Sequence, residues 1–103
     1  MDDHARKVIA QVLPVLMGAV TINTLQEDPD GMATLTFIAE GLDIPLDDLL
    51  GVGGEDMLKV TCLSFSLIQM VSAILTEVAE MTGRKVEDVL PLFGAVAARR
   101  ALG

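Results

Sequence analysis

Apolar residues recur at every third or fourth position through most of this chain, the spacing that gathers side chains on one face of an α-helix. The longest such segment runs from Glu55 to Met81 and contains neither proline nor glycine. Glu55 and Asp56 place negative charge in its first turn, where the helix dipole favours it, and Gly83 suits the left-handed conformation that ends many helices. The pattern therefore predicts one long helix over residues 55–81. We expect its apolar face to meet the protein core, and that face comprises Val60, Leu63, Leu67, Met70, Val71, Ile74, Leu75, Val78 and Met81.

The opposite face of this helix carries small or neutral side chains, and no charge occurs between Val60 and Thr76. A helix with one face in water ordinarily places lysine and glutamate on that face. We therefore expect the long helix to be covered on both sides, with its neutral face in or beside a contact between two subunits. In a monomeric alternative, the first and last helices of the chain enclose it instead. The residues expected at the interface are Thr61, Phe65, Ser66, Gln69, Ser72, Ala73 and Thr76.

Two further long segments at the ends of the chain have helical spacing. The first covers about 25 residues, with Asp2 or Asp3 as its cap and a kink or split at Pro14, because proline lacks a backbone N–H. The last covers residues 86–102, and Pro91 predicts a bend or a late start there.

Shorter elements fill the middle of the chain. Residues 27–31 are rich in turn formers, and Asp30 is placed to cap the following helix. We interpret residues 32–40 as a helix, although part of this segment also alternates like a strand. Residues 46–50 predict a short helix, with Asp43 as a plausible cap. The fold class is therefore all-α: a single domain over residues 1–103, a small bundle of four to five helices around the long one, and a dimer.

Residues 36–50 and 76–90 align without gaps, and each has a helix end, a tight turn and a helix start. Two similar helical corners or a duplication both explain this repeat. The segment from Ile38 to Gly51, which reads IAEGLDIPLDDLLG, also resembles the closing helices of repressor-type helix-turn-helix domains. The resemblance covers fourteen residues of 103 and implies an alternative function, a small DNA-binding regulator. Its basic residues would be Arg84, Lys85, Arg99 and Arg100, contributed by two subunits.

The charge distribution argues against nucleic acid as a partner. The net charge is −8, and neither lysine nor arginine occurs between Val8 and Leu58. An acidic surface repels phosphates and anionic membranes, so we expect neither nucleic acid nor membrane as a partner. The acidic residues would form either a solvated face or a docking face for a basic protein surface. That candidate docking face comprises Asp43, Asp47, Asp48, Glu55 and Asp56.

Hydrophobic residues make up 51% of the chain, a large share for a domain with much surface relative to its volume. The excess predicts burial in an oligomer or against a partner. The uncharged run from Val8 to Gln26 has the length of a membrane segment, but its polar residues and proline favour a core helix. The single cysteine, Cys62, excludes an internal disulfide and suits the cytoplasm, and we expect its thiol to be buried.

The chain contains few of the residues from which catalytic sites are usually built. One histidine, His4, and one cysteine assemble neither a catalytic triad nor a zinc site. We therefore expect no enzyme activity, no metal and no cofactor. The leading hypothesis is a non-catalytic protein–protein interaction or regulatory adaptor module, acting as a homodimer or as a subunit of an assembly. A further alternative is a carrier of an apolar ligand in a deformable cavity lined by Met17, Met57, Met70 and Met81.

Overall fold

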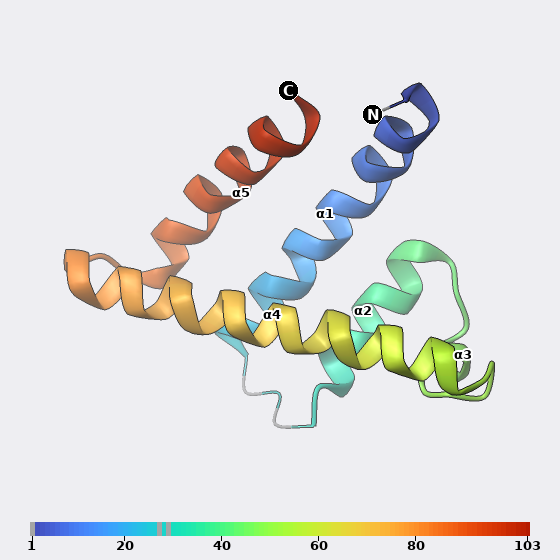
Figure 1. The fold of residues 1–103 in the computed structure, drawn as a ribbon. Coiled ribbons are helices and arrows are strands. Elements are labelled where there is room, and N and C mark those ends of the chain that lie inside the picture. Colours follow the sequence, from blue (N-terminus) through green and yellow to red (C-terminus); the bar gives the residue numbers. More distant parts are fainter. Residues whose placement is uncertain (1, 27, 29) are drawn as a thin grey trace.

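The computed structural model describes residues 2–26, 28 and 30–103, and every regular element within these ranges is an α-helix. This confirms the all-α class and the helix expected over residues 32–40, where the strand alternative is wrong. Glu27 and Pro29, which belong to the predicted turn, lie outside the described residues. In chain order the helices are α1 (Asp3–Leu25), α2 (Met32–Leu42), α3 (Leu46–Leu49), α4 (Glu55–Thr82) and α5 (Val86–Leu102), as Figure 1 shows.

Pro14 and Pro91 each lie within a helix, and neither interrupts it. The Asp2 carboxylate accepts a hydrogen bond of 2.7 Å from the backbone N–H of Ala5, so it caps α1 as expected. The helix then continues through Pro14 to Leu25 as one element, and the expected split is wrong. Helix α5 begins at Val86 and contains Pro91, so its start is not late. Each proline costs one backbone hydrogen bond without ending its helix.

The side chain of Asp28 stabilises the start of α2 by accepting hydrogen bonds. Its Oδ1 atom accepts a hydrogen bond from the backbone N–H of Ala33 at 3.1 Å. Its Oδ2 atom accepts from the N–H of Thr34 at 2.9 Å and from the Thr34 hydroxyl at 2.7 Å. The Thr34 hydroxyl lowers the pKa of Asp28 below its ordinary value, and the two backbone N–H groups add to this, whereas burial opposes it. Asp30 accepts only from the N–H of Met32, at 3.1 Å.

The two corners predicted from the internal repeat share the same backbone hydrogen bonds. The N–H of Asp43 bonds to the carbonyl of Glu40, and the N–H of Gly83 bonds to that of Glu80. Both Asp43 (φ 55°) and Gly83 (φ 69°) adopt the left-handed conformation. Asp43 therefore ends α2, and the expectation that it caps α3 is wrong, because α3 follows Pro45 and has no side-chain cap.

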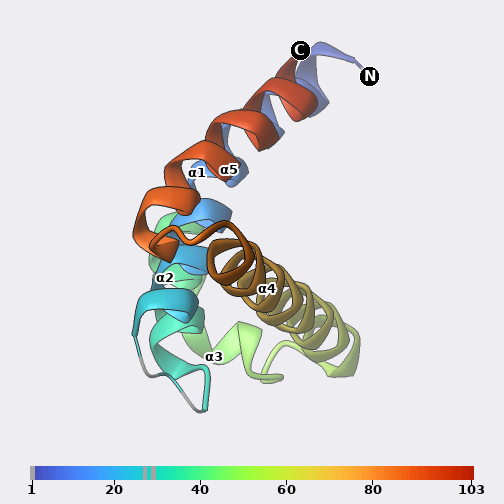
Figure 2. The same ribbon diagram turned by 90° about the vertical axis from the view of Figure 1, so that its left-hand side faces the viewer.

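Helix α4 packs against α1, α3 and α5, while α1 also packs against α2 and α5. Figures 1 and 2 show α1 and α5 side by side, crossing α4 and projecting away from it, so that both chain ends lie at the same extremity. The fold is flat, with extents of 43 × 36 × 19 Å, and its least dimension is about two helix diameters. The core cluster comprises Ala19, Val20, Ile68, Leu75, Ala79, Val89 and Leu90.

Candidate interaction surface

The buried face of α4 matches neither of the two faces expected from the sequence. Small side chains let α1 approach closely, and the hydroxyl oxygens of Thr24 in α1 and Ser72 in α4 are in hydrogen-bond contact at 2.9 Å. The Thr61 hydroxyl donates to the Met57 carbonyl within α4 at 3.0 Å, so burial leaves it satisfied. The side of α4 that α1 and its neighbours cover therefore consists mainly of small residues. The buried residues of α4 are Thr61, Ile68, Ser72, Leu75 and Ala79.

Most of the face predicted for the core lies at the surface instead. We call its exposed part the apolar stripe; its side chains retain between 40% and 78% of their accessible area. Neighbouring members are three or four residues apart, so they form one continuous line about 32 Å long on a helix. Contiguous exposed apolar surface of this extent usually marks an interaction site. The apolar stripe comprises Val60, Leu63, Leu67, Met70, Ile74, Val78 and Met81.

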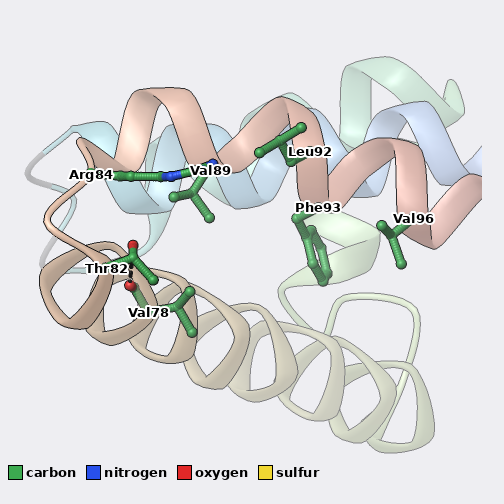
Figure 3. A pocket seen from close by; sticks show the side chains of 7 residues that line it. All are labelled: Val78, Thr82, Arg84, Val89, Leu92, Phe93 and Val96. Atoms are coloured by element: carbon green, nitrogen blue, oxygen red, sulfur yellow. Dashed lines mark hydrogen bonds between the residues drawn. The ribbon is translucent and has the colours of Figure 1, made fainter.

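Two open grooves adjoin the apolar stripe. The first, of about 580 Å³, lies between α4 and α5, and Figure 3 shows Val78, Phe93 and Val96 directed into it. The second, of about 430 Å³, lies among α1, α4 and α5, and its only polar lining residue is Ser64. Phe93 lines both grooves. Since Val78 lines the first and Leu67 the second, the stripe and the grooves form one apolar surface.

Only part of the expected interface remains available to another chain. Thr61 and Ser72 are buried within this chain, so they offer little area to a second subunit. Phe65 is half-buried, and its ring occupies the space beside Gly31. Cys62 is exposed, contrary to expectation. The remaining four residues lie at the surface between the stripe and the buried face, and their part in an interface stays a prediction: Ser66, Gln69, Ala73 and Thr76.

Charged side chains lie at the extremities of the fold. The candidate acidic docking face spans the end of α2, all of α3 and the first turn of α4; Asp48 is half-buried, while Asp43, Asp47, Glu55 and Asp56 are exposed. Basic residues collect elsewhere, where the start of α1 and the end of α5 meet at one extremity (Figure 1). This basic end carries Arg6, Lys7, Arg99 and Arg100.

The geometry gives little support to the two alternative functions, a DNA-binding regulator and a carrier with a cavity lined by methionines. Arg84 and Arg99 lie at opposite ends of α5, about 22 Å apart along the axis, so the basic set implied by the helix-turn-helix resemblance does not cluster. Within the described residues, no three acidic, histidine or cysteine side chains are grouped as metal ligands. Met17 lines the groove among α1, α4 and α5, but the exposed Met70 and Met81 share no cavity with it.

Helices α1 and α4 are long and apolar enough to cross a membrane, a property shared by many core helices, so it is weak evidence. The chain matches no protein-family profile, no curated protein and no solved structure. The apolar stripe and its surroundings are therefore the features that bear on function.

Proposed function

We propose that this protein is a non-catalytic protein–protein interaction module that acts as a homodimer, with α4 at the centre of the assembly. The observation that carries this proposal is the apolar stripe. Its seven side chains, together with the grooves beside them, present exposed area on the order of the ~800 Å² that each partner contributes to a standard interface. A monomer would leave this area in water, which costs roughly 25 cal/mol for each Å².

A second copy of the chain is the partner that this surface suits best. A two-fold interface brings the same patch of both subunits together, so a single apolar stripe supplies both halves of the contact. Spacings of three and four residues also match those by which paired helices interlock their side chains. The acidic docking face gives the dimer an adaptor role towards a basic protein surface, and Asp43 and Asp47 extend it beyond α4.

Sedimentation velocity of the purified chain over a range of concentrations tests the proposal. We expect a dimer for the natural sequence and a monomer for Met70→Glu at the same concentration, because a carboxylate would be buried in the contact without a partner. The expected rise in the dimer dissociation constant is about 100-fold or more, which corresponds to at least about 2.7 kcal/mol. Circular dichroism checks that the variant retains its helices.

The control is Gln11→Glu, which introduces the same charge. This residue is exposed on α1 and lines neither groove, so the charge should leave the dimer intact. A natural chain that sediments as a monomer, or a Met70→Glu variant that still forms the dimer, would overturn the proposal.

The groove among α1, α4 and α5 supports a second candidate function, a carrier of an apolar ligand. Its lining is apolar except for Ser64, and its volume of about 430 Å³ is in the range of small-molecule sites. Native mass spectrometry of the chain after mild purification distinguishes the two functions. A carrier would show an added mass below that of a second chain, whereas the interaction module would show twice the mass of the chain alone.

A further inference from the structure

We infer that two copies pair through α4 in an antiparallel orientation, about a two-fold axis that passes between Met70 and Val71. This inference rests on the proposed self-association and adds its geometry. The positions of the apolar side chains along α4 and the signs of the charges that flank them support this orientation.

The apolar stripe is symmetric about its own midpoint. In an antiparallel pair centred between Met70 and Val71, each residue faces the one equally far beyond the midpoint in the partner. Six of the seven side chains of the stripe then face one another, since the residue numbers in each pair sum to the same value, and Met70 faces the half-buried Val71 beside the axis. The facing pairs are Val60 with Met81, Leu63 with Val78, and Leu67 with Ile74.

The charges beyond the stripe become complementary in the same arrangement. Asp56 lies just beyond the end of α4 of the second copy, near the turn that carries Arg84 and Lys85 in that copy. Measured along the helix axis, Lys59 lies about half a turn from Glu80 of the second copy. All of these side chains are exposed. Opposite charges therefore meet at both ends of the contact, and they meet twice because the axis is two-fold.

The positions of these charges around the helix agree with this pairing. Asp56 precedes Val60 by four residues and Leu63 by seven, so it continues the line of the apolar stripe. Lys59 and Glu80 are separated by 21 residues, three heptads, which places both on nearly the same flank of α4. In a two-fold antiparallel pair each flank meets the equivalent flank of the partner. Lys59 and Glu80 can therefore approach across the interface.

A parallel pairing in register would remove these attractions. Asp56, which continues the line of the stripe, would face Asp56 of the second copy, whereas Lys59 and Glu80, which share one flank, would lie on the far side of the contact from their counterparts. The two helix dipoles would also point in the same direction. Like charges placed opposite each other disfavour a wrong arrangement strongly. The apolar side chains alone permit either orientation, so the flanking charges select the antiparallel one.

Electron paramagnetic resonance of a spin-labelled chain measures the orientation. The native thiol is first removed by Cys62→Ser, and the label is attached through Val60→Cys at the exposed start of the stripe. An antiparallel dimer separates the two labels by about 32 Å, 21 residues of helix rise. A parallel dimer brings them to about 10 Å, the distance between packed helices. The short distance would overturn the antiparallel inference and leave the dimer itself standing.

Charge reversal gives a second measurement that needs no label. Lys59→Glu should raise the dimer dissociation constant about ten-fold, because two attractive pairs become repulsive. Adding Glu80→Lys in the same chain should restore the original value. In a parallel dimer the two copies of Lys59 lie on opposite flanks of the contact, so the single change alters little. If the dissociation constant of the double variant does not return to the natural value, the antiparallel pairing is wrong. If the natural chain is itself a monomer, the proposed function is wrong instead.

Discussion

Replacing Asp28 with alanine should destabilise the chain more than any other single change at the start of α2. The carboxylate accepts two backbone N–H groups and the hydroxyl of Thr34. Loss of a capping carboxylate costs about 1 kcal/mol. Thr34 is fully buried, with 0% of its area exposed, so its hydroxyl would lose its acceptor where water cannot replace it. That adds roughly 1–3 kcal/mol, and we expect a total of about 2–4 kcal/mol.

Urea unfolding followed by circular dichroism measures this difference, at one fixed protein concentration because association also stabilises the folded chain. The corresponding fall in Tm is roughly 10–20 °C for a domain of this size. Asp30→Ala is the matched control, since Asp30 accepts a single exposed hydrogen bond from Met32. We expect it to cost less than about 0.5 kcal/mol.

Thr34→Val completes a double-mutant cycle with Asp28→Ala. If the two side chains stabilise one another, the double variant should lose less than the sum of the single losses, by about 1 kcal/mol. Equal losses for Asp28→Ala and Asp30→Ala would refute the reasoning, because they differ in the number and burial of the bonds they remove. Strictly additive losses in the cycle would refute the part assigned to Thr34.

The remaining predictions concern pH and glycine. The folded pKa of Asp28 lies below its ordinary value of 3.8, so the stability it contributes is present above that pH and is lost as the pH falls through the lowered value. Acid titration of unfolding should therefore show the natural chain losing its advantage over Asp28→Asn below about pH 4. Gly31→Ala should cost at least about 1 kcal/mol more than Gly83→Ala in urea unfolding. Both glycines adopt the left-handed conformation, but a Cβ at Gly31 would collide with the Phe65 ring, whereas one at Gly83 meets nothing within 4 Å; equal costs would contradict the collision.

Helix positions follow from the sequence because they depend on local spacing and local chemistry. The rhythm of apolar residues predicts α4 to within one residue at its end, and Gly83 adopts the left-handed conformation that its lack of a Cβ allows. Asp43 shows the limit of this reasoning. Aspartate usually begins helices, yet it also tolerates the left-handed conformation, and here it ends α2 in the way that Gly83 ends α4.

The orientation of α4 about its axis could not be predicted in the same way. The apolar face and the neutral face of α4 both lack charge between Val60 and Thr76. Periodicity therefore identifies the more apolar face but does not show which face the other helices cover. In the fold, α1 crosses α4 at an angle (Figure 1), and small residues such as Ala79 and Ser72 allow that close approach. A crossing helix covers only a few turns. The larger side chains of the apolar stripe therefore stay outside, where a helix along the whole length of α4 would be needed to cover them.

Most of α4 lacks charge, and charged residues occur near both of its ends. If α4 forms an interface, one explanation accounts for both features. A charge within the stripe would be buried against the second copy without a partner, which is costly. A charge beyond the stripe stays near water and can still choose among orientations. Asp56 and Lys59 precede the stripe, Glu77 and Glu80 flank its last turns at exposed positions, and Arg84 follows it, so the signs reverse from one end to the other. A helix that only needed solubility would have no reason to confine its charges in this order, and for that reason the flanking charges, more than the stripe itself, point to a second antiparallel copy.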